Sequence, residues 1–167
     1  MSVQIVWFKR DLRLRDHLPL VRANETARAS GGGVVCLAML EPEVLDAEDW
    51  ADQHTDHLLA SLDDLDRHLS RLGARLTYRE GEAVRTLEGL LRDADGDVTL
   101  WSHQETGNAI TFERDKRVAR WCRDRGVAWN EIAQNGVVRG LTDRDGWAQR
   151  WQRLMDTPLA PAPERIT

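Results

Sequence analysis

The sequence has only two cysteines, Cys36 and Cys122, which lie far apart, and it has no CxxC pair or cluster of histidines and cysteines. It therefore offers neither a disulfide framework nor the ligand spacing of a zinc site. No apolar run approaches the roughly 20 residues that a membrane-spanning helix needs. The first residues also lack the charged and then apolar order of a secretion signal. We therefore expect a protein of the reducing cytoplasm.

An excess of positive charge is also missing. The 23 Lys and Arg residues are outnumbered by 28 Asp and Glu residues, which gives a formal net charge of −5. This balance argues against binding of DNA by bulk electrostatic attraction alone. The length of 167 residues suits one domain, and the mean hydropathy of −0.52 is typical of a globular protein rather than a disordered or membrane-embedded one.

Five short apolar runs predict β-strands. They lie at 3–8, 33–40, 74–78, 98–102 and 127–132. Because these runs are almost continuously apolar, they are typical of a parallel sheet that is covered on both faces.

The segments between the runs predict helices. In the clearest, 52–72, leucines recur at spacings of three and four and Gly73 follows the last of them. The other expected helices lie at 18–29, 82–92 and 112–125. The alternation predicts an α/β fold: a doubly wound, Rossmann-like, five-stranded parallel sheet in the order 3-2-1-4-5, with helices on both faces.

The order of this sheet reverses between the first and fourth strands. Ligands of doubly wound sheets bind at such a point, outside the carboxyl ends of the strands. The loops after these two strands are 9–17 and 103–110, so we expect both to flank a binding crevice.

The last part of the chain differs from the rest. We place the α/β domain at 1–133 and an inter-domain connector at 134–167. Thr142 and Asp145 resemble a capping box that opens a helix over about 142–155. Three prolines within 158–163 then predict an extended linker, so we expect more protein to follow in the native gene product. The tryptophans of this helix, Trp147 and Trp151, suggest an inter-domain surface, with an electron-transfer chain as the alternative.

Two polar segments are candidates for a ligand site. Residues 7–16 carry four cations and two carboxylates, which suit an anionic or carbonyl-bearing ligand, although an Arg–Asp network that pins the loop explains them as well. Residues 103–108 offer amide and carboxylate groups for the edge of a heterocycle, although turn formation explains Gly107 and Asn108 equally well. His54 and His57 lack a third ligand, so we expect no metal site.

Together these segments resemble the photolyase/cryptochrome family, in its bacterial branch. Residues 7–13 are similar to the family's opening motif W-F-[RK]-R-D-L-R. The linker 158–163 is similar to the tether to the next domain. Further matching segments lie between these two, at 103–108 with Arg114 and Asp115, at 135–139 and at 144–147. One departure is His17, which begins H-L-P-L where many members have N-P-A-L.

The resemblance implies the N-terminal domain of such a protein. In the family this domain often holds an antenna chromophore (a folate, a deazaflavin, FMN or a lumazine), although the antenna is sometimes lost. FAD, the electron-transfer tryptophans and the pocket for a flipped pyrimidine dimer lie in a C-terminal helical domain, which is absent from these 167 residues. By motif position, the resemblance assigns the chromophore contacts to Arg10, Asp11, Leu12, Leu40, Gln104, Glu105 and Asn108.

The implied function is that of the antenna domain of a blue-light-absorbing flavoprotein, which repairs pyrimidine dimers in DNA or signals. Its partners would be the helical FAD-binding domain of the same protein and damaged DNA, and we expect a monomer. We expect these residues alone not to be catalytic. Two alternatives stay open: a stand-alone universal-stress-like nucleotide-binding module, and a docking domain without a chromophore.

Overall fold

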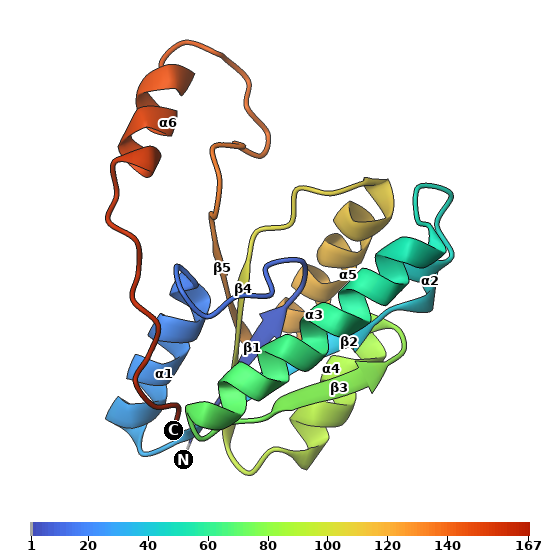
Figure 1. The fold of residues 1–167 in the computed structure, drawn as a ribbon, viewed down its shortest axis with the longest axis vertical. Coiled ribbons are helices and arrows are strands. Elements are labelled where there is room, and N and C mark those ends of the chain that lie inside the picture. Colours follow the sequence, from blue (N-terminus) through green and yellow to red (C-terminus); the bar gives the residue numbers. More distant parts are fainter. Residues whose placement is uncertain (1) are drawn as a thin grey trace.

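A five-stranded sheet forms the centre of the computed structural model, which describes residues 2–167 (Figure 1). The strands are β1 (Ser2–Phe8), β2 (Gly33–Leu40), β3 (Leu76–Glu80), β4 (Asp97–His103) and β5 (Ala128–Ile132). All neighbouring strands are parallel, and their order is β3-β2-β1-β4-β5. The predicted fold class and strand order are therefore confirmed.

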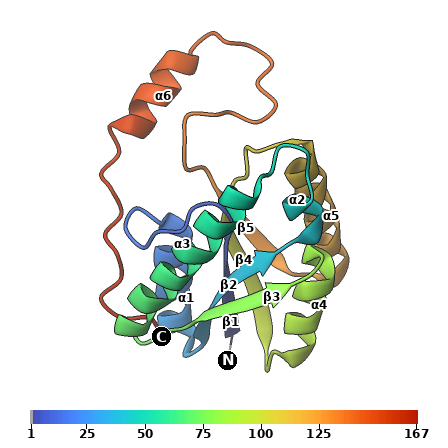
Figure 2. The same ribbon diagram turned by 45° about the vertical axis from the view of Figure 1, so that its right-hand side comes forward.

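Six helices accompany this sheet in the described residues. They are α1 (Leu18–Ser30), α2 (Pro42–Leu45), α3 (Asp52–Arg71), α4 (Ala83–Asp93), α5 (Ala109–Arg125) and α6 (Trp147–Met155). Helices α1 and α3 cover one face of the sheet, and α4 and α5 cover the other (Figure 2).

Strand β1 shows why the apolar runs are continuous. Ile5 and Trp7 belong to the core under α4 and α5, whereas Val6 and Phe8 belong to the core under α1 and α3. Successive side chains of a strand point to opposite faces. Because each face is covered by helices, the buried positions of this strand are apolar except Gln4, whose side-chain amide is hydrogen-bonded to Ser2 and Trp101.

Some boundaries differ from the prediction. Helix α6 begins at Trp147, not near residue 142, because Gly146 precedes it in a left-handed conformation (φ 77°) that stops the helix from extending backwards. The expected capping box between Thr142 and Asp145 does not form, because the N–H of Asp145 donates to the side chain of Asp143 instead (2.9 Å). Helix α2, only four residues long, was not predicted.

Residues 133–167 form an arm that leaves β5, carries α6 away from the sheet and returns to it (Figures 1 and 2). The returning end is tied to the domain. The N–H of Val34 donates to the carbonyl of Thr167 (2.9 Å), and the N–H of Ile166 donates to that of Leu72 (2.8 Å). Because the Ile166 side chain is buried among α1, α3 and β2, the last residues complete the core on that face.

Within residues 2–167, no helix has the length and apolar character needed to cross a bilayer. Both cysteines are free and buried. Burial raises the pKa of the Cys36 thiol to about 12 and that of the Cys122 thiol to about 11, so both are held in the unreactive thiol form.

Candidate functional site

A cavity of about 640 Å³ lies at the carboxyl ends of β1 and β2. Its walls come from the loop after β1, the end of β2, the segment from α2 to the first turns of α3, and the start of α5. The two loops that the sequence placed beside a crevice do approach each other, because Asp11 contacts His103 and the Arg10 guanidinium lies 4.0 Å from the Glu105 carboxylate. This is the point where the strand order reverses, as expected for a doubly wound sheet.

The apolar part of the cavity is largely aromatic and aliphatic. Trp7 and Phe8, at the end of β1, are almost fully buried. Trp50 also lines the cavity, from the segment between α2 and α3. Its indole N–H donates to Thr55 (2.9 Å), and its ring packs edge-on against His54. Hydrogen bonding and stacking together fix the orientation of the Trp50 ring, which is a useful property for a wall of a binding site.

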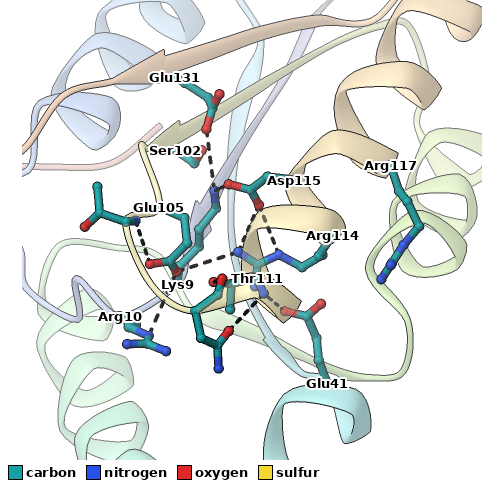
Figure 3. A network of polar contacts seen from close by, with 12 residues as sticks. Lys9, Arg10, Glu41, Ser102, Glu105, Thr111, Arg114, Asp115, Arg117 and Glu131 are labelled. Carbon is teal, nitrogen blue, oxygen red and sulfur yellow. Dashed lines mark hydrogen bonds and ion pairs between the residues drawn. The ribbon is translucent and has the colours of Figure 1, made fainter. Parts of the chain in front are cut away.

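Buried ion pairs form the floor of the cavity (Figure 3). The Lys9 ammonium lies 3.0 Å from Asp115, and the Arg114 guanidinium donates to Asp115 (2.9 Å) and to Glu41 (2.7 Å). Each of these charges therefore has a partner of opposite sign, which burial requires.

The electrostatics of this floor are set mainly by burial. Burial lowers the pKa of the Lys9 ammonium, although Asp115 opposes the shift. Burial raises the pKa of the Glu41 carboxyl, and Arg114 opposes that shift. The pKa of Arg114 itself is raised, because attraction to Glu41 and Asp115 outweighs the opposing effect of burial. The two cations also lie over the Trp7 ring, at 4.6 Å for Lys9 and 4.7 Å for Arg114.

Arg139 connects the arm to this floor. Its guanidinium donates to the Glu105 carbonyl (2.9 Å) and to the Glu131 carboxylate (3.1 Å), and it lies 3.3 Å from Asp115. The first residues of the arm are therefore attached to the β4–α5 loop, to β5 and to α5. The sequence marked 135–139 as a matching segment, but nothing in it indicated this contact.

A second buried group of polar side chains lies behind the cavity wall at Asp11. One oxygen of the Asp11 carboxylate accepts from the N–H of Lys9 (2.9 Å). The other lies 2.5 Å from His103 Nδ1 and 2.8 Å from His17 Nε2. Burial alone would raise the pKa of Asp11, but the hydrogen bond from His103 and the close contact with the His17 ring outweigh it and hold this pKa far below its ordinary value. Asp11 is therefore a carboxylate.

The same three side chains have the chemistry of metal ligands, but their geometry is that of hydrogen bonds. Ligands held at about 2.1 Å from a tetrahedral metal ion lie about 3.4 Å apart, which is farther than Asp11 lies from either ring nitrogen. The Nδ1 atom of His17 also accepts from the N–H of Leu20 (3.1 Å), which leaves the ring proton on Nε2, the nitrogen that a metal would need. The group therefore does not fit a metal ion.

The seven residues assigned by resemblance fall into two sets. Arg10, Asp11, Leu12 and Glu105 line the cavity; Leu40, Gln104 and Asn108 do not. Leu40 packs on the core under α1 and α3. The backbone N–H of Gln104 donates to Ile132 (2.8 Å). Asn108 caps α5 by accepting from the N–H of Thr111 (3.1 Å), and it donates to Asp49 (3.0 Å), which lines the cavity.

Sequence reasoning missed the wall that comes from α2 and α3. Trp50, His54 and His57 all line the cavity. The leucine stripe of α3 predicted that this helix packs on the sheet, but it contained no signal that the first turns extend past the edge of the sheet. The cavity is therefore lined by three stretches of the chain, 7–13, 38–62 and 105–114, and its aromatic wall and charged rim suit the binding of a flat ligand with polar edges.

Comparison with known proteins agrees with this geometry. A family profile described as DNA photolyase matches residues 4–142. The deoxyribodipyrimidine photo-lyase of Agrobacterium fabrum is 33% identical over 98% of this chain and 34% of its own length. The cryptochrome DASH of Gloeobacter violaceus is 29% identical over 69% of this chain and 23% of its own length.

Solved structures give the same result. A class III photolyase from Agrobacterium tumefaciens superposes with a TM-score of 0.77 at 25% identity, over all of this chain and 35% of its own. An archaeal photolyase from Sulfolobus tokodaii, described as holding two FAD molecules and implying a novel light-harvesting cofactor, superposes with a TM-score of 0.73 at 19% identity, a level that bears on the fold alone. The chain spans between about a quarter and two fifths of the length of these proteins. It belongs to the DNA photolyase family.

Proposed function

We propose that this chain is an antenna-type domain whose cavity holds a flat aromatic chromophore: a folate, a deazaflavin, FMN or a lumazine. The observation that carries this proposal is the cavity of about 640 Å³ with tryptophan walls at the switch point of the sheet. Its volume lies within the range of roughly 300–1,000 Å³ that is usual for sites of small organic ligands.

The residues present fit such a group. Trp50, which is half-buried on the cavity wall, offers an apolar ring surface against which a heterocycle can pack, and the almost fully buried Trp7 and Phe8 lie beneath the cavity. Arg10, whose side chain is 53% exposed, and Arg13 stand at the rim and suit the carboxylate or phosphate tail that several of these chromophores carry. When bound, the chromophore would supply light absorption; the chain's own residues bind it, orient it and shield it from water.

The whole protein's activity is also part of this proposal. Light-driven repair of pyrimidine dimers in DNA, or blue-light signalling, would require FAD in a helical domain, and these 167 residues would not catalyse it alone. The arm supports the presence of such a partner domain: Trp147 and Trp151 keep 40% and 41% of their surface exposed on one face of α6. Exposed tryptophans on one face of a helix are typical of an interaction surface.

Binding of each chromophore to the purified chain tests the proposal. FMN, a deazaflavin, methenyltetrahydrofolate and a lumazine would be titrated separately, with ATP as the probe for a nucleotide-binding module. We expect at least one chromophore to bind and Trp50→Ala to weaken it at least tenfold. Arg85→Ala, on α4 and away from the cavity, serves as the matched control. Failure of every chromophore to bind would favour the docking domain without a chromophore, and ATP alone binding would favour the nucleotide module.

A further inference from the structure

The group formed by Asp11, His17 and His103 is the most deeply buried set of titratable side chains near the cavity. Their residues are 5%, 0% and 3% exposed, respectively. Of the three, only Asp11 lines the cavity, so the two histidines stand behind it. They come from the start of α1 and from the end of β4, and Asp11 joins these two elements to the loop after β1.

Asp11 sits between two residues that also line the cavity, Arg10 and Leu12. Its carboxylate accepts from the N–H of Lys9 and lies within hydrogen-bond distance of both imidazoles, so three of its roughly four lone-pair sites face groups of the protein itself. A carboxylate engaged in this way fixes the backbone around it more effectively than it binds a ligand. The cavity loop, residues 9–13, is therefore held through Asp11.

His17 can cap α1 in only one protonation state. Its Nδ1 atom accepts from the N–H of Leu20 and so caps the N-terminus of α1. The proton of the neutral ring must then lie on Nε2, which faces Asp11 at 2.8 Å but is not well enough aligned for a good hydrogen bond. A second proton on Nδ1 would point at the N–H of Leu20, and the cap would be lost.

We propose that His17 is a positioning residue whose neutral ring caps α1 while it stands against Asp11, so that uptake of a second proton in mild acid breaks the cap and loosens the cavity loop. The relevance of this loosening to a ligand rests on the function proposed above; the loosening itself does not. His17 is the point where this sequence departs from the N-P-A-L pattern, so the property belongs to this chain's own residue.

The charges around His17 support this assignment. Burial lowers the pKa of His17, and the attraction of Asp11 opposes the shift. His103, whose ring lies 4.6 Å away, and Arg13 from the cavity loop both act to lower it. Arg13 is itself 3.9 Å from Asp16, and the remaining neighbour, Phe8, is uncharged. The closed loop therefore disfavours the proton, whereas an opened loop exposes a histidine of ordinary pKa, near 6.5.

Hydrogen exchange of the intact chain tests the proposal without any ligand. The N–H groups of Lys9 and Leu20, which belong to this group of contacts, are followed by NMR between pH 7.5 and pH 5.5. Uptake of one proton on opening makes their protection factors fall about tenfold over this range. In His17→Asn, whose amide can still cap α1 but does not titrate, the factors should vary less than twofold. His68→Asn, at an exposed histidine of α3, should keep the tenfold fall.

A second measurement does not depend on any variant. Long-range 1H–15N spectra of the histidines should show the His17 proton on Nε2 at pH 7.5. A proton on Nδ1, or a fall in protection that persists unchanged in His17→Asn, would overturn the proposal. Titration with each of the four chromophores over the same pH range keeps the two hypotheses apart: failure of all four to bind counts against the proposed function, whereas the exchange data judge the role of His17.

Discussion

Arg114 provides the sharpest test of the buried floor of the cavity. Arg114 is 3% exposed and makes the only side-chain hydrogen bond to the Glu41 carboxylate among the described residues. Asp115, by contrast, also has Lys9 and Arg139 as partners. Replacement Arg114→Met keeps the volume of the side chain but leaves Glu41 as a buried, unpaired charge.

The expected cost of Arg114→Met is about 3–5 kcal/mol in the free energy of unfolding, because one partner of a buried ion pair is removed. The matched control is Arg117→Met, in the same helix. Arg117 lies 2.7 Å from Glu43, but both side chains are well exposed, and Arg117 points away from the floor (Figure 3). An exposed pair contributes about 0–1 kcal/mol, so the control should cost no more than that.

Urea unfolding at several pH values measures the effect and its origin. Burial already raises the pKa of Glu41, and loss of the cation raises it further. A carboxyl group whose pKa is raised in the folded state destabilises the protein once the pH exceeds the pKa that the group has in the unfolded chain, near 4.5. The deficit of Arg114→Met should therefore be larger at pH 8 than at pH 5. Adding Glu41→Gln should recover about 1–3 kcal/mol at pH 8. A deficit below 1 kcal/mol, or one that does not change with pH, would refute the reasoning.

Three further predictions concern other parts of the chain. Asn108→Ala removes the cap of α5 and should lower the free energy of unfolding by about 0.5–2 kcal/mol in urea titrations; no change would show that the cap contributes nothing. The thiols of Cys36 and Cys122 should react with a disulfide reagent at pH 8 only as fast as the chain unfolds, and immediate reaction would contradict their burial. In Gly136→Ala, the new Cβ would stand 2.1 Å from the ring of Trp151, so α6 must shift; the NMR signal of the Trp151 indole should move while the urea midpoint stays within error, and an unmoved signal would contradict the packing of the arm.

The sequence was sufficient for the sheet because burial on both faces produces a strong and local signal. The nearly continuous apolar run of β1, for example, needs no knowledge of its partners to be recognised. The strand order followed from general rules for doubly wound sheets, and so did the edge at which the cavity lies.

The composition of the site was harder to predict because it depends on contacts between distant residues. The carboxylate of Asp11 was expected to touch a ligand, yet its lone pairs are largely directed to His17, His103 and the backbone of Lys9. Trp50 entered the cavity only because a short helix of four residues, α2, turns the chain back over the edge of the sheet. Such placements leave no periodic pattern in the sequence.

The start of α6 illustrates a different difficulty. Thr142 and Asp145 have the right spacing for a capping box, but Gly146 adopts a left-handed conformation and fixes the first turn four residues later than Thr142 predicts. A glycine at a turn is compatible with several conformations, so spacing alone does not decide between them.

The central claim is that a flat chromophore packs on Trp50, above the buried Trp7, in the cavity at the carboxyl edge of the sheet. The most direct measurement is an NMR titration of the seven tryptophan indole N–H signals with each chromophore, after assignment by single Trp→Phe replacements. We predict that a saturating chromophore shifts the signals of Trp50 and Trp7 and leaves those of Trp147 and Trp151 in place. Saturable binding that moves only the two tryptophans of the arm would contradict the account.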